Sequence, residues 1–425
     1  MVIPHPFLFA TRQNSVYCKK GNRKINIYTY IKNVLIYYLT KTHPLMQTAQ
    51  FHFQNQSWDT LSDQGVKNPN FILCFGAREL IEEEKYKPFL KEKYPNTPVL
   101  IVSTAGEINN NKVSENSIVA NAVEFDDPKS RIKYNSINLT NFESSTEAGI
   151  ELVKELIEDD LKLILLFSDG QLVNGSELVD GVNQVVNKSI PVTGGLAADG
   201  GNFNKTLVGI NEDIQEGNVV AIGLYGDKLN VGFGSKGGWG QFGPERIITK
   251  SKKNVVEEID EKNAVDLYRL YLGKDADDLV RKSFYFPISI KDETEENSIV
   301  RTILSIDEDN KTMTFAGNMP QGSKVRLMKF NTDNLLHAST EAMFDSQKGL
   351  PTNNALSILI TCIGRKVVLN RRFDNELEAA QEGWENPNAV FTGFYSYGEI
   401  APFPGFIKCE LHNQTMTITT ITESE

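Results

Sequence analysis

Two apolar stretches, Phe71-Ile-Leu-Cys-Phe-Gly76 and Pro98-Val-Leu-Ile-Val-Ser103, flank a charged run from Glu79 to Tyr94 and decide the fold class. Continuous apolar runs of this length are typical of strands buried on both faces, and the charged run predicts a helix that Pro95 ends. A strand, a helix and a second strand in this order form the unit of an α/β sheet. The same alternation is predicted again over Ser145–Glu158 (helix), Leu161–Phe167 (strand), Asn174–Asn187 (helix) and Ile190–Thr193 (strand).

After Gly194 the pattern changes, because strands follow one another without helices between them. These strands are predicted over Thr206–Ile210, Val219–Tyr225 and Leu229–Gly234. Short polar turns separate them, which indicates hairpins. The glycine-rich stretch Gly234–Gly243 is the expected end of this first domain.

Beyond that boundary we expect a mainly antiparallel sheet with covering helices. Strands are predicted over Arg246–Lys250, Phe284–Ile290, Ile299–Ile306, Thr312–Phe315, Lys324–Phe330, Ala355–Ile363, Val390–Tyr397, Phe406–His412 and Met416–Thr422, and helices over Asn263–Leu272, Asp333–Phe344 and Asp374–Trp384. The predicted fold class is therefore α/β to α+β. Residues 46–240 would form a domain of α/β units followed by antiparallel strands, and residues 241–425 the second domain.

The chain has 425 residues, 40% of them hydrophobic and 23% charged, which excludes a wholly disordered chain and suits two domains. Its net charge of −11 is unevenly distributed. Residues 1–45 contain seven Lys and Arg and no Asp or Glu, which leaves the remainder with a net charge of −18. An acidic body repels phosphate polymers, so we expect no binding to nucleic acid.

The basic extension over residues 1–45 has no assigned role. Its apolar run from Ile25 to Leu39 follows a cationic cluster, as in a signal peptide, but Lys32 and Asn33 interrupt it and it is shorter than the about 20 residues that span a bilayer. Two interpretations stay open. Translation starts at Met46, or the extension is a basic helix that attaches to a surface. We expect no membrane span.

Few motifs of catalysis are present. The chain has no G-x-x-x-x-G-K-[ST], G-x-S-x-G or H-E-x-x-H pattern, no C-x-x-C pair and no histidine pair with metal-ligand spacing. Two G-x-G-x-x-G matches lie within Gly232–Gly243, but a predicted strand follows them where a dinucleotide site needs a helix. These observations favour a protein that is not an enzyme and holds no metal; an enzyme of undetected mechanism is the alternative.

Two clusters are candidates for ligand binding. In Gly194-Gly-Leu-Ala-Ala-Asp-Gly-Gly201, four glycines after a strand let backbone amides approach a carboxylate or phosphate closely, which makes Gly194, Gly195 and Asp199 candidate residues. The structural alternative is a tight connection between strands.

The second cluster lies near the carboxyl terminus. If residues 391–400 form one strand, Tyr395, Tyr397 and Glu399 face the same side, beside the open surface left by Gly393 and Gly398. With Arg365 they would suit a small ligand. The alternative is an Arg365–Glu399 ion pair that orders the sheet.

At these residues the sequence resembles the FIST family, a two-part sensory module of prokaryotic signalling proteins, with a FIST N and a FIST C domain. The resemblance rests on Ser103-Thr-Ala-Gly-Glu-Ile108, Phe167-Ser-Asp-Gly170, Gly194–Gly201, Phe242-Gly-Pro-Glu-Arg-Ile-Ile-Thr-Lys-Ser251, Asn263–Gly273, Cys362-Ile-Gly-Arg365, Gly393–Pro402 and His412-Asn-Gln-Thr415. It covers about residues 70–422. Asn413, in the last motif, joins the expected ligand-binding residues.

The resemblance implies a cytoplasmic sensor of small ligands such as amino acids, in which no cofactor is required. Because no output domain is recognisable, the expected partner is a signalling protein in trans, such as a histidine kinase or a chemotaxis receptor. Some proteins of this class are similar to haem-based nitric oxide sensors. That alternative requires an axial ligand, for which His337 and His412 are the candidates.

Overall fold

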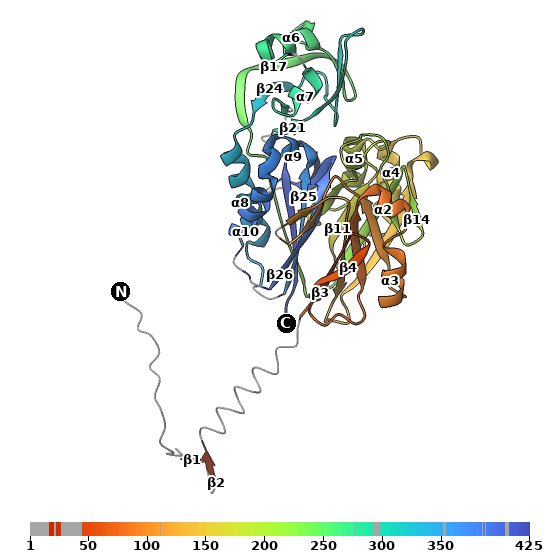
Figure 1. The fold of residues 1–425 in the computed structure, drawn as a ribbon, viewed down its shortest axis with the longest axis vertical. Coiled ribbons are helices and arrows are strands. Elements are labelled where there is room, and N and C mark those ends of the chain that lie inside the picture. The colour runs from red at the N-terminus through yellow and green to blue at the C-terminus, as the bar shows by residue number, and fades with distance from the viewer. Residues whose placement is uncertain are drawn as a thin grey trace, which may run out of the picture. The chain divides into compact units, whose positions relative to one another are not determined.

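The computed structural model describes residues 17–20, 23–26, 45–110, 112–276, 278–291, 298–351, 354–384, 386, 388–403 and 408–425 (Figure 1). The chain divides into two units, Met1–Leu45 and Met46–Glu425. In the first, β1 (Tyr17–Lys20) pairs antiparallel with β2 (Arg23–Asn26). The two interpretations of the basic extension concern residues that lie mostly outside the described part, so both stay predictions.

The second unit contains three sheets that form its body, residues 46–239 and 331–425. The first sheet has the order β10 (Arg131–Asn138), β15 (Asn218–Tyr225), β11 (Leu161–Ser168), β12 (Val192–Leu196), β27 (Gly398–Pro402) and β28 (Cys409–His412). The second has the order β14 (Asp213–Gln215), β13 (Val208–Ile210), β6 (Val99–Ser103), β5 (Phe71–Gly76), β9 (Ile118–Glu124), β3 (Gln47–Gln54) and β4 (Ser57–Asp63). The third has the order β16 (Leu229–Lys236), β29 (Met416–Glu423), β25 (Ala355–Cys362), β26 (Ala389–Ser396), β7 (Glu107–Asn109) and β8 (Lys112–Ser114).

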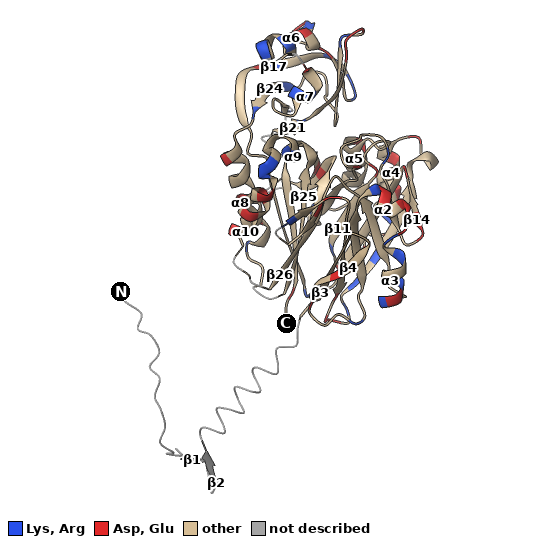
Figure 2. Ribbon diagram, in the orientation of Figure 1, with Lys and Arg blue, Asp and Glu red and all other residues tan. Residues whose placement is uncertain are grey.

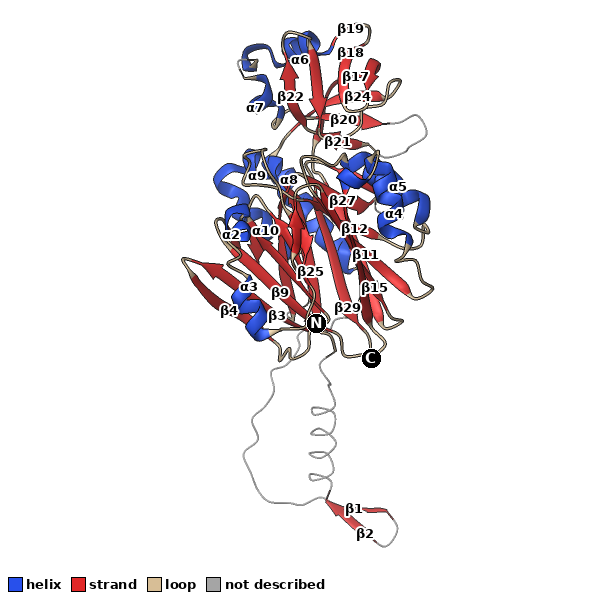
Figure 3. Cartoon of the chain, turned by 90° about the vertical axis from the view of Figure 1, so that its right-hand side faces the viewer, coloured by secondary structure: helices blue, strands red, loops and turns tan. Residues whose placement is uncertain are grey.

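Helices lie on the outer faces of these sheets (Figure 3). They are α2 (Arg78–Glu82), α3 (Lys87–Lys93), α4 (Ser145–Lys154), α5 (Gly175–Val185), α8 (Thr332–Gln347), α9 (Ile363–Leu369) and α10 (Phe373–Glu382). Each of α4, α5 and α8 begins after an Asn or Ser whose side chain accepts a backbone N–H of the first turn. No helix in the described part of the chain is long and apolar enough to cross a membrane.

Residues 240–330 form a smaller sheet with its own core, which we call the cap. Its strands are β21 (Ile299–Arg301), β20 (Ile288–Lys291), β24 (Lys324–Lys329), β17 (Gly240–Lys252), β18 (Val255–Ile259), β23 (Thr312–Phe315) and β22 (Ile303–Asp307), with β19 (Lys262–Asn263) beside β18. Helices α6 (Ala264–Leu272) and α7 (Leu279–Ser283) pack on this sheet. The chain enters the cap after β16 and leaves it before α8.

The three sheets of the body meet in one apolar core, with one phenylalanine from each sheet at the centre. The Phe75 ring of β5 lies 4.9 Å from that of Phe394 in β26, and 6.1 Å from that of Phe167 in β11. All three side chains are fully buried. Aromatic rings at these separations bury a large apolar area, so they hold the sheets together.

Each of the three sheets of the body contains one parallel pair of strands. These pairs are β5 with β6, β11 with β12 and β25 with β26. The loops that follow the second strand of each pair, residues 103–107, 196–200 and 395–399, bond to one another. Tyr395 N donates to Gly106 O at 2.9 Å, Tyr397 N to Leu196 O at 3.3 Å and Ala198 N to Ser103 O at 2.9 Å. We call these three segments the loop ring. Because parallel strands end together, the ring closes over the carboxyl ends of all three pairs.

The mixed α/β and α+β fold class is confirmed, while several predicted elements differ. The helix expected over Glu79–Tyr94 is split into α2 and α3, because Glu84 has a φ of +53°. The strand expected over residues 391–400 breaks at Tyr397, where β26 of the third sheet ends and β27 of the first begins. Strands from both sides of residue 240 share sheets, since β16 pairs with β29 and β12 with β27. The boundary at residue 240 stays a prediction.

Candidate functional site

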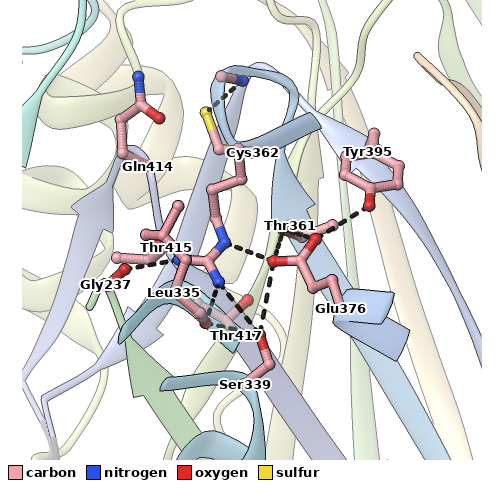
Figure 4. A network of polar contacts seen from close by, with 12 residues as sticks. Gly237, Leu335, Ser339, Thr361, Cys362, Glu376, Tyr395, Gln414, Thr415 and Thr417 are labelled. Carbon is pink, nitrogen blue, oxygen red and sulfur yellow. Dashed lines mark hydrogen bonds and ion pairs between the residues drawn. The ribbon is translucent and has the colours of Figure 1, made fainter. Parts of the chain in front are cut away.

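Arg365 is fully buried, as are Glu376 and Tyr395, and Figure 4 shows the network of polar contacts to which they belong. Arg365 Nε donates to Glu376 Oε1 at 2.5 Å, and the two side chains form an ion pair with no exposed surface. The Tyr395 hydroxyl donates to the other carboxylate oxygen of Glu376 at 2.9 Å. Burial, together with the charge of Glu376, raises the pKa of Tyr395. Arg365 and Tyr395 therefore meet through Glu376, a residue that the sequence prediction did not include.

The same guanidinium holds both connections between the body and the cap. Arg365 Nη1 donates to Gly237 O at 2.6 Å, just before the chain enters the cap. Its Nη2 donates to Leu335 O at 2.8 Å and to Ser339 Oγ at 3.1 Å, both in α8, just after the chain leaves it. With these donors occupied inside the protein, Arg365 acts as a structural anchor of the cap, and the expected contact with a ligand carboxylate would require breaking the cluster.

Glu399 lies apart from this cluster, and the alternative of an Arg365–Glu399 ion pair is wrong. Its carboxylate accepts the hydroxyls of Ser396 at 2.6 Å and Thr415 at 2.7 Å, and the Thr415 amide at 3.1 Å. Burial in the protein raises the pKa of Glu399 to about 7, although these hydrogen bonds oppose the shift. Glu399 has partners other than the predicted one because its strand, β27, belongs to the first sheet and not to the third.

Glu107 occupies a corresponding place in another segment of the loop ring. It is also buried, accepts the hydroxyls of Thr104 at 2.5 Å and Ser117 at 2.6 Å, and has its pKa raised to about 7 by burial. Glu107 and Glu399 thus share one design, a carboxyl group held by two hydroxyls at the end of a parallel strand pair. Sequence reasoning missed Glu107 as a candidate, although the motif Ser103–Ile108 contains it.

The glycines of the first cluster pack strands closely. A Cβ atom on Gly194 would lie 1.8 Å from Leu166 O, and one on Gly195 would lie 2.8 Å from Ile360 Cγ2. Both residues sit inside β12. Their small size is therefore explained by strand packing, which supports the structural alternative for these two positions. Asn413 is fully buried, and neither polar atom of its side chain has a hydrogen-bond partner in the described part of the chain.

Asp199 and Tyr397 come together, as members of one site would. The Tyr397 hydroxyl donates to the Asp199 carboxylate. The same carboxylate accepts the amides of Phe203 at 2.9 Å, Asn204 at 3.0 Å and Lys205 at 2.9 Å. Burial and the Asp199 carboxylate together raise the pKa of Tyr397. One carboxylate therefore fixes both the loop after β12 and the tyrosine at the end of β26.

Phe203 stacks on Tyr397, with ring centroids 4.4 Å apart and an angle of 8° between the planes. Its φ of +53° is uncommon for a bulky residue, and the residue is 40% exposed. The amide bonds to Asp199 hold the backbone in this conformation. Strain of this kind persists where the surrounding structure imposes it, and it is found mainly at functional positions.

A cavity of about 440 Å³ opens beside this stack, at the carboxyl ends of β11 and β12. From the body it is lined by Gly170–Gly175, Leu196, Phe203 and Tyr397, and from the cap by Asn254, Leu304 and Phe315–Gly317. Of the eight predicted site residues, Tyr397 lines it directly. A volume of this size holds a small molecule, and the place at the ends of parallel strands is common for ligand sites.

The cap closes this cavity through polar contacts to the start of α5. Asn174 Nδ2 donates to Asn318 Oδ1 at 3.1 Å, and Asn318 N donates to Ser176 Oγ at 3.0 Å. Lys253 of the cap pairs with Glu177 of α5 at 2.8 Å. The cavity is therefore shared between the body and the cap.

Another cavity, of about 220 Å³, borders the loop after β12 at Asp199, Gly200 and Asn202. Its wall includes Arg78, Glu107, Glu115, Asp199 and Gly200. Lys366 adjoins it, donating to Ala105 O at 2.7 Å and pairing with Glu115 at 2.5 Å. Asp199 thus contributes to a second cavity, while its bonded partner Tyr397 lines the first.

The candidate haem ligands do not fit a haem site. His412 is buried, its Nε2 bonds to Ala401 O at 2.9 Å, and burial lowers its pKa to about 4. His337 lies on the exposed face of α8, beside Glu341. Neither side chain faces one of the described cavities, and no group of His, Cys, Asp and Glu suited to a metal occurs among the described residues.

Replacing Arg365 by Met should lower the free energy of unfolding by about 3–5 kcal/mol, because it leaves Glu376 charged and unpaired in the core. The double variant Arg365→Met/Glu376→Met should recover part of the loss. Denaturant unfolding measures the free energy of unfolding of both variants. The control is Arg371→Met at an exposed position, whose free energy of unfolding should stay within about 0.5 kcal/mol of wild type. Equal stability of Arg365→Met and Arg371→Met would contradict the anchoring role.

The raised pKa of Glu399 makes stability depend on pH. Between pH 4.5 and 7 the folded state keeps the proton while the unfolded chain has released it, so unfolding becomes easier as pH rises through this range. The contribution amounts to about 3 kcal/mol for a shift from 4.5 to about 7. Because Gln cannot ionise, the stability of wild type relative to Glu399→Gln should fall by this amount, as measured by urea unfolding. If the stability of wild type and of Glu399→Gln changed equally with pH, the pKa of Glu399 would not be raised by folding.

Comparison with known proteins assigns the family. Residues 70–262 match the model of the FIST N domain, and residues 264–402 match that of the FIST C domain. The chain is also 26% identical over 259 residues to an uncharacterized protein of Methanocaldococcus jannaschii. That match covers 57% of this chain and 47% of the relative, so the chain spans about half the length of that curated relative. Together the two domain matches include every motif that carries the resemblance except Asn263, which lies between them, and the final His412–Thr415, and the chain belongs to the FIST family.

Proposed function

We propose that this protein is a sensory module of signal transduction that binds a small ligand in the cavity between body and cap. FIST domains are associated with sensing, which gives the general role. The observation that supports this site is the shared cavity of about 440 Å³, whose wall includes the Tyr397–Phe203 stack. A ligand that contacts both sides would stabilise the closed cap, because a ligand shifts an equilibrium toward the conformation to which it binds more tightly.

The proposal places the signal in the position of the cap. Arg365 anchors its two connections, while Lys253–Glu177 and Asn318–Asn174 hold its far side against α5. A ligand bound among these contacts would strengthen them, whereas an empty cavity leaves them alone to hold the cap. A cytoplasmic partner in trans, such as a histidine kinase or a chemotaxis receptor, would then recognise the closed cap.

This proposal moves the ligand away from Arg365 and Glu399. Both side chains are fully buried and have hydrogen-bond partners inside the body. The haem alternative gains no support from His337 and His412, and among the described residues that line the cavity no nucleophile is paired with a base. Ligand binding without chemistry is the function that the cavity supports best.

A library of amino acids, nucleobases, nucleosides, sugars and carboxylic acids should contain compounds that raise the melting temperature of the protein. Ala316→Trp fills the cavity from the cap side and should abolish that rise. Leu270→Trp places the same side chain on the cap surface, where Leu270 is 77% exposed, and should preserve it. Stabilisation that survives Ala316→Trp would place the ligand elsewhere.

A further inference from the structure

We propose that the ligand of this cavity is an uncharged molecule with a planar heteroaromatic ring of the nucleobase or nicotinamide type, stacked against Phe203. This inference rests on the proposed function and specifies its ligand. It departs from the expectation of an amino acid, because the walls of the cavity differ from the site that the sequence indicated.

The residues that line the cavity suit an uncharged ligand. Lys, Arg, Asp and Glu are distributed over body and cap (Figure 2), but every described residue that lines the cavity is uncharged. Lys253 of the cap and Glu177 of α5 do not line the cavity and pair with each other at 2.8 Å. A zwitterion would lose water from a carboxylate and an ammonium without gaining an opposite charge, which is costly. An uncharged ligand avoids that cost.

Behind the wall lies one buried guanidinium, that of Arg301. A Cβ atom on Gly317 would lie 2.7 Å from Arg301 Nε, so this group lies against Gly317, and Gly317 rather than Arg301 lines the cavity. Arg301 Nη1 donates to Leu411 O at 2.7 Å. The guanidinium therefore serves contacts within the protein, and the surface offered to the ligand is the neutral backbone of Gly317.

The stacked rings of Tyr397 and Phe203 form an aromatic wall that suits a planar ligand. One side of Tyr397 contacts the backbone of Gly170, where a Cβ atom would lie 3.1 Å from Tyr397 Cδ2, and Phe203 stacks on it with planes 8° apart. Phe203 lines the cavity, and the residue is 40% exposed. A further planar ring can extend this stack, as bases do on aromatic side chains. The φ of +53° at Phe203 is the conformation that presents its ring in this way.

The polar groups that line the cavity are mainly side-chain amides. Gln171, Asn174 and Asn254 contribute primary amides. The oxygen of Asn174 accepts the amide of Glu177, so Asn174 offers a ligand an N–H alone, whereas Asn254 offers an N–H and its oxygen. Asn174 and Asn254 are oriented by bonds to Asn318 Oδ1 and Phe315 O. Amides of this kind match the ring nitrogens, carbonyls and amino groups on the edge of a heteroaromatic ring, and they need no charge.

Two matched comparisons test charge and planarity. Nicotinamide and nicotinate share a ring but differ in a carboxylate, while nicotinamide and cyclohexanecarboxamide share an amide but differ in planarity. Titration of the full chain by ligand-observed NMR, with adenine, uracil, glycine and arginine added to the series, gives each affinity. We expect the uncharged planar probes to bind at least about tenfold more tightly than nicotinate, cyclohexanecarboxamide and the amino acids.

Variants connect that preference to Phe203. Phe203→Leu should weaken binding of the planar probes by about tenfold, whereas Phe203→Tyr, which keeps the ring, should retain it. Ala316→Trp should abolish it and Leu270→Trp should not. If Phe203→Leu fails to fold, the comparison of Phe203→Tyr with Ala316→Trp still locates the ring.

Each remaining outcome overturns a defined claim. Tighter binding of nicotinate or an amino acid that Ala316→Trp abolishes would refute the ligand class and leave the proposed function standing. Binding of the planar probes that persists in Ala316→Trp would refute both. Absence of binding by all planar probes at millimolar concentration would refute the ligand class alone, since the broader library tests the function.

Discussion

The hydrogen bond from the Tyr397 hydroxyl to the Asp199 carboxylate is the contact on which the candidate site depends. It joins residues 198 positions apart and is reinforced by the three consecutive amides that Asp199 accepts. A buried carboxylate requires such partners, because leaving it unpaired costs several kcal/mol. The carboxylate therefore imposes the loop conformation that places Phe203 on Tyr397.

The loop ring explains why this contact forms at all. Three parallel strand pairs end at the same edge of the body, and backbone bonds such as Tyr397 N to Leu196 O hold their following loops together. Arg365 adds the second constraint, since it ties the chain at Gly237 and Leu335. The ring thus determines one wall of the cavity, and the buried cluster determines where the other wall, the cap, is attached.

The parts of the fold that depend on local pattern could be predicted from the sequence. Phe71–Gly76 and Leu161–Phe167 form buried strands as their apolar runs indicate, and Asn174 begins α5 as an N-cap residue does. The exchange of strands between sheets could not be predicted, because β27 is separated from β12 by about half the chain and its alternation fits either sheet.

The site was predictable only in part for the same reason. The two clusters include Asp199 and Tyr397, and the structure joins them. The partner of Arg365 was missed because Glu376 lies in a helix of ordinary composition, where its burial leaves no mark in the sequence. Phe203 was missed because a positive φ at a residue other than glycine has no pattern that indicates it, although its position two residues after Gly200-Gly201 was a signal.

Amide hydrogen exchange in Tyr397→Phe tests the central claim most directly, because this variant keeps the ring and removes only the hydroxyl, which donates to Asp199 and accepts the Phe203 amide at 3.1 Å. Asn204 and Lys205, whose amides bond to Asp199 alone, are therefore the decisive positions. The account predicts that the amides of Phe203, Asn204 and Lys205 exchange about tenfold faster or more, corresponding to a loss of roughly 1–3 kcal/mol, while Ala105 and Ala198 of the loop ring keep their protection. Unchanged exchange at residues 203–205 would contradict it, as would equal loss of protection throughout the ring.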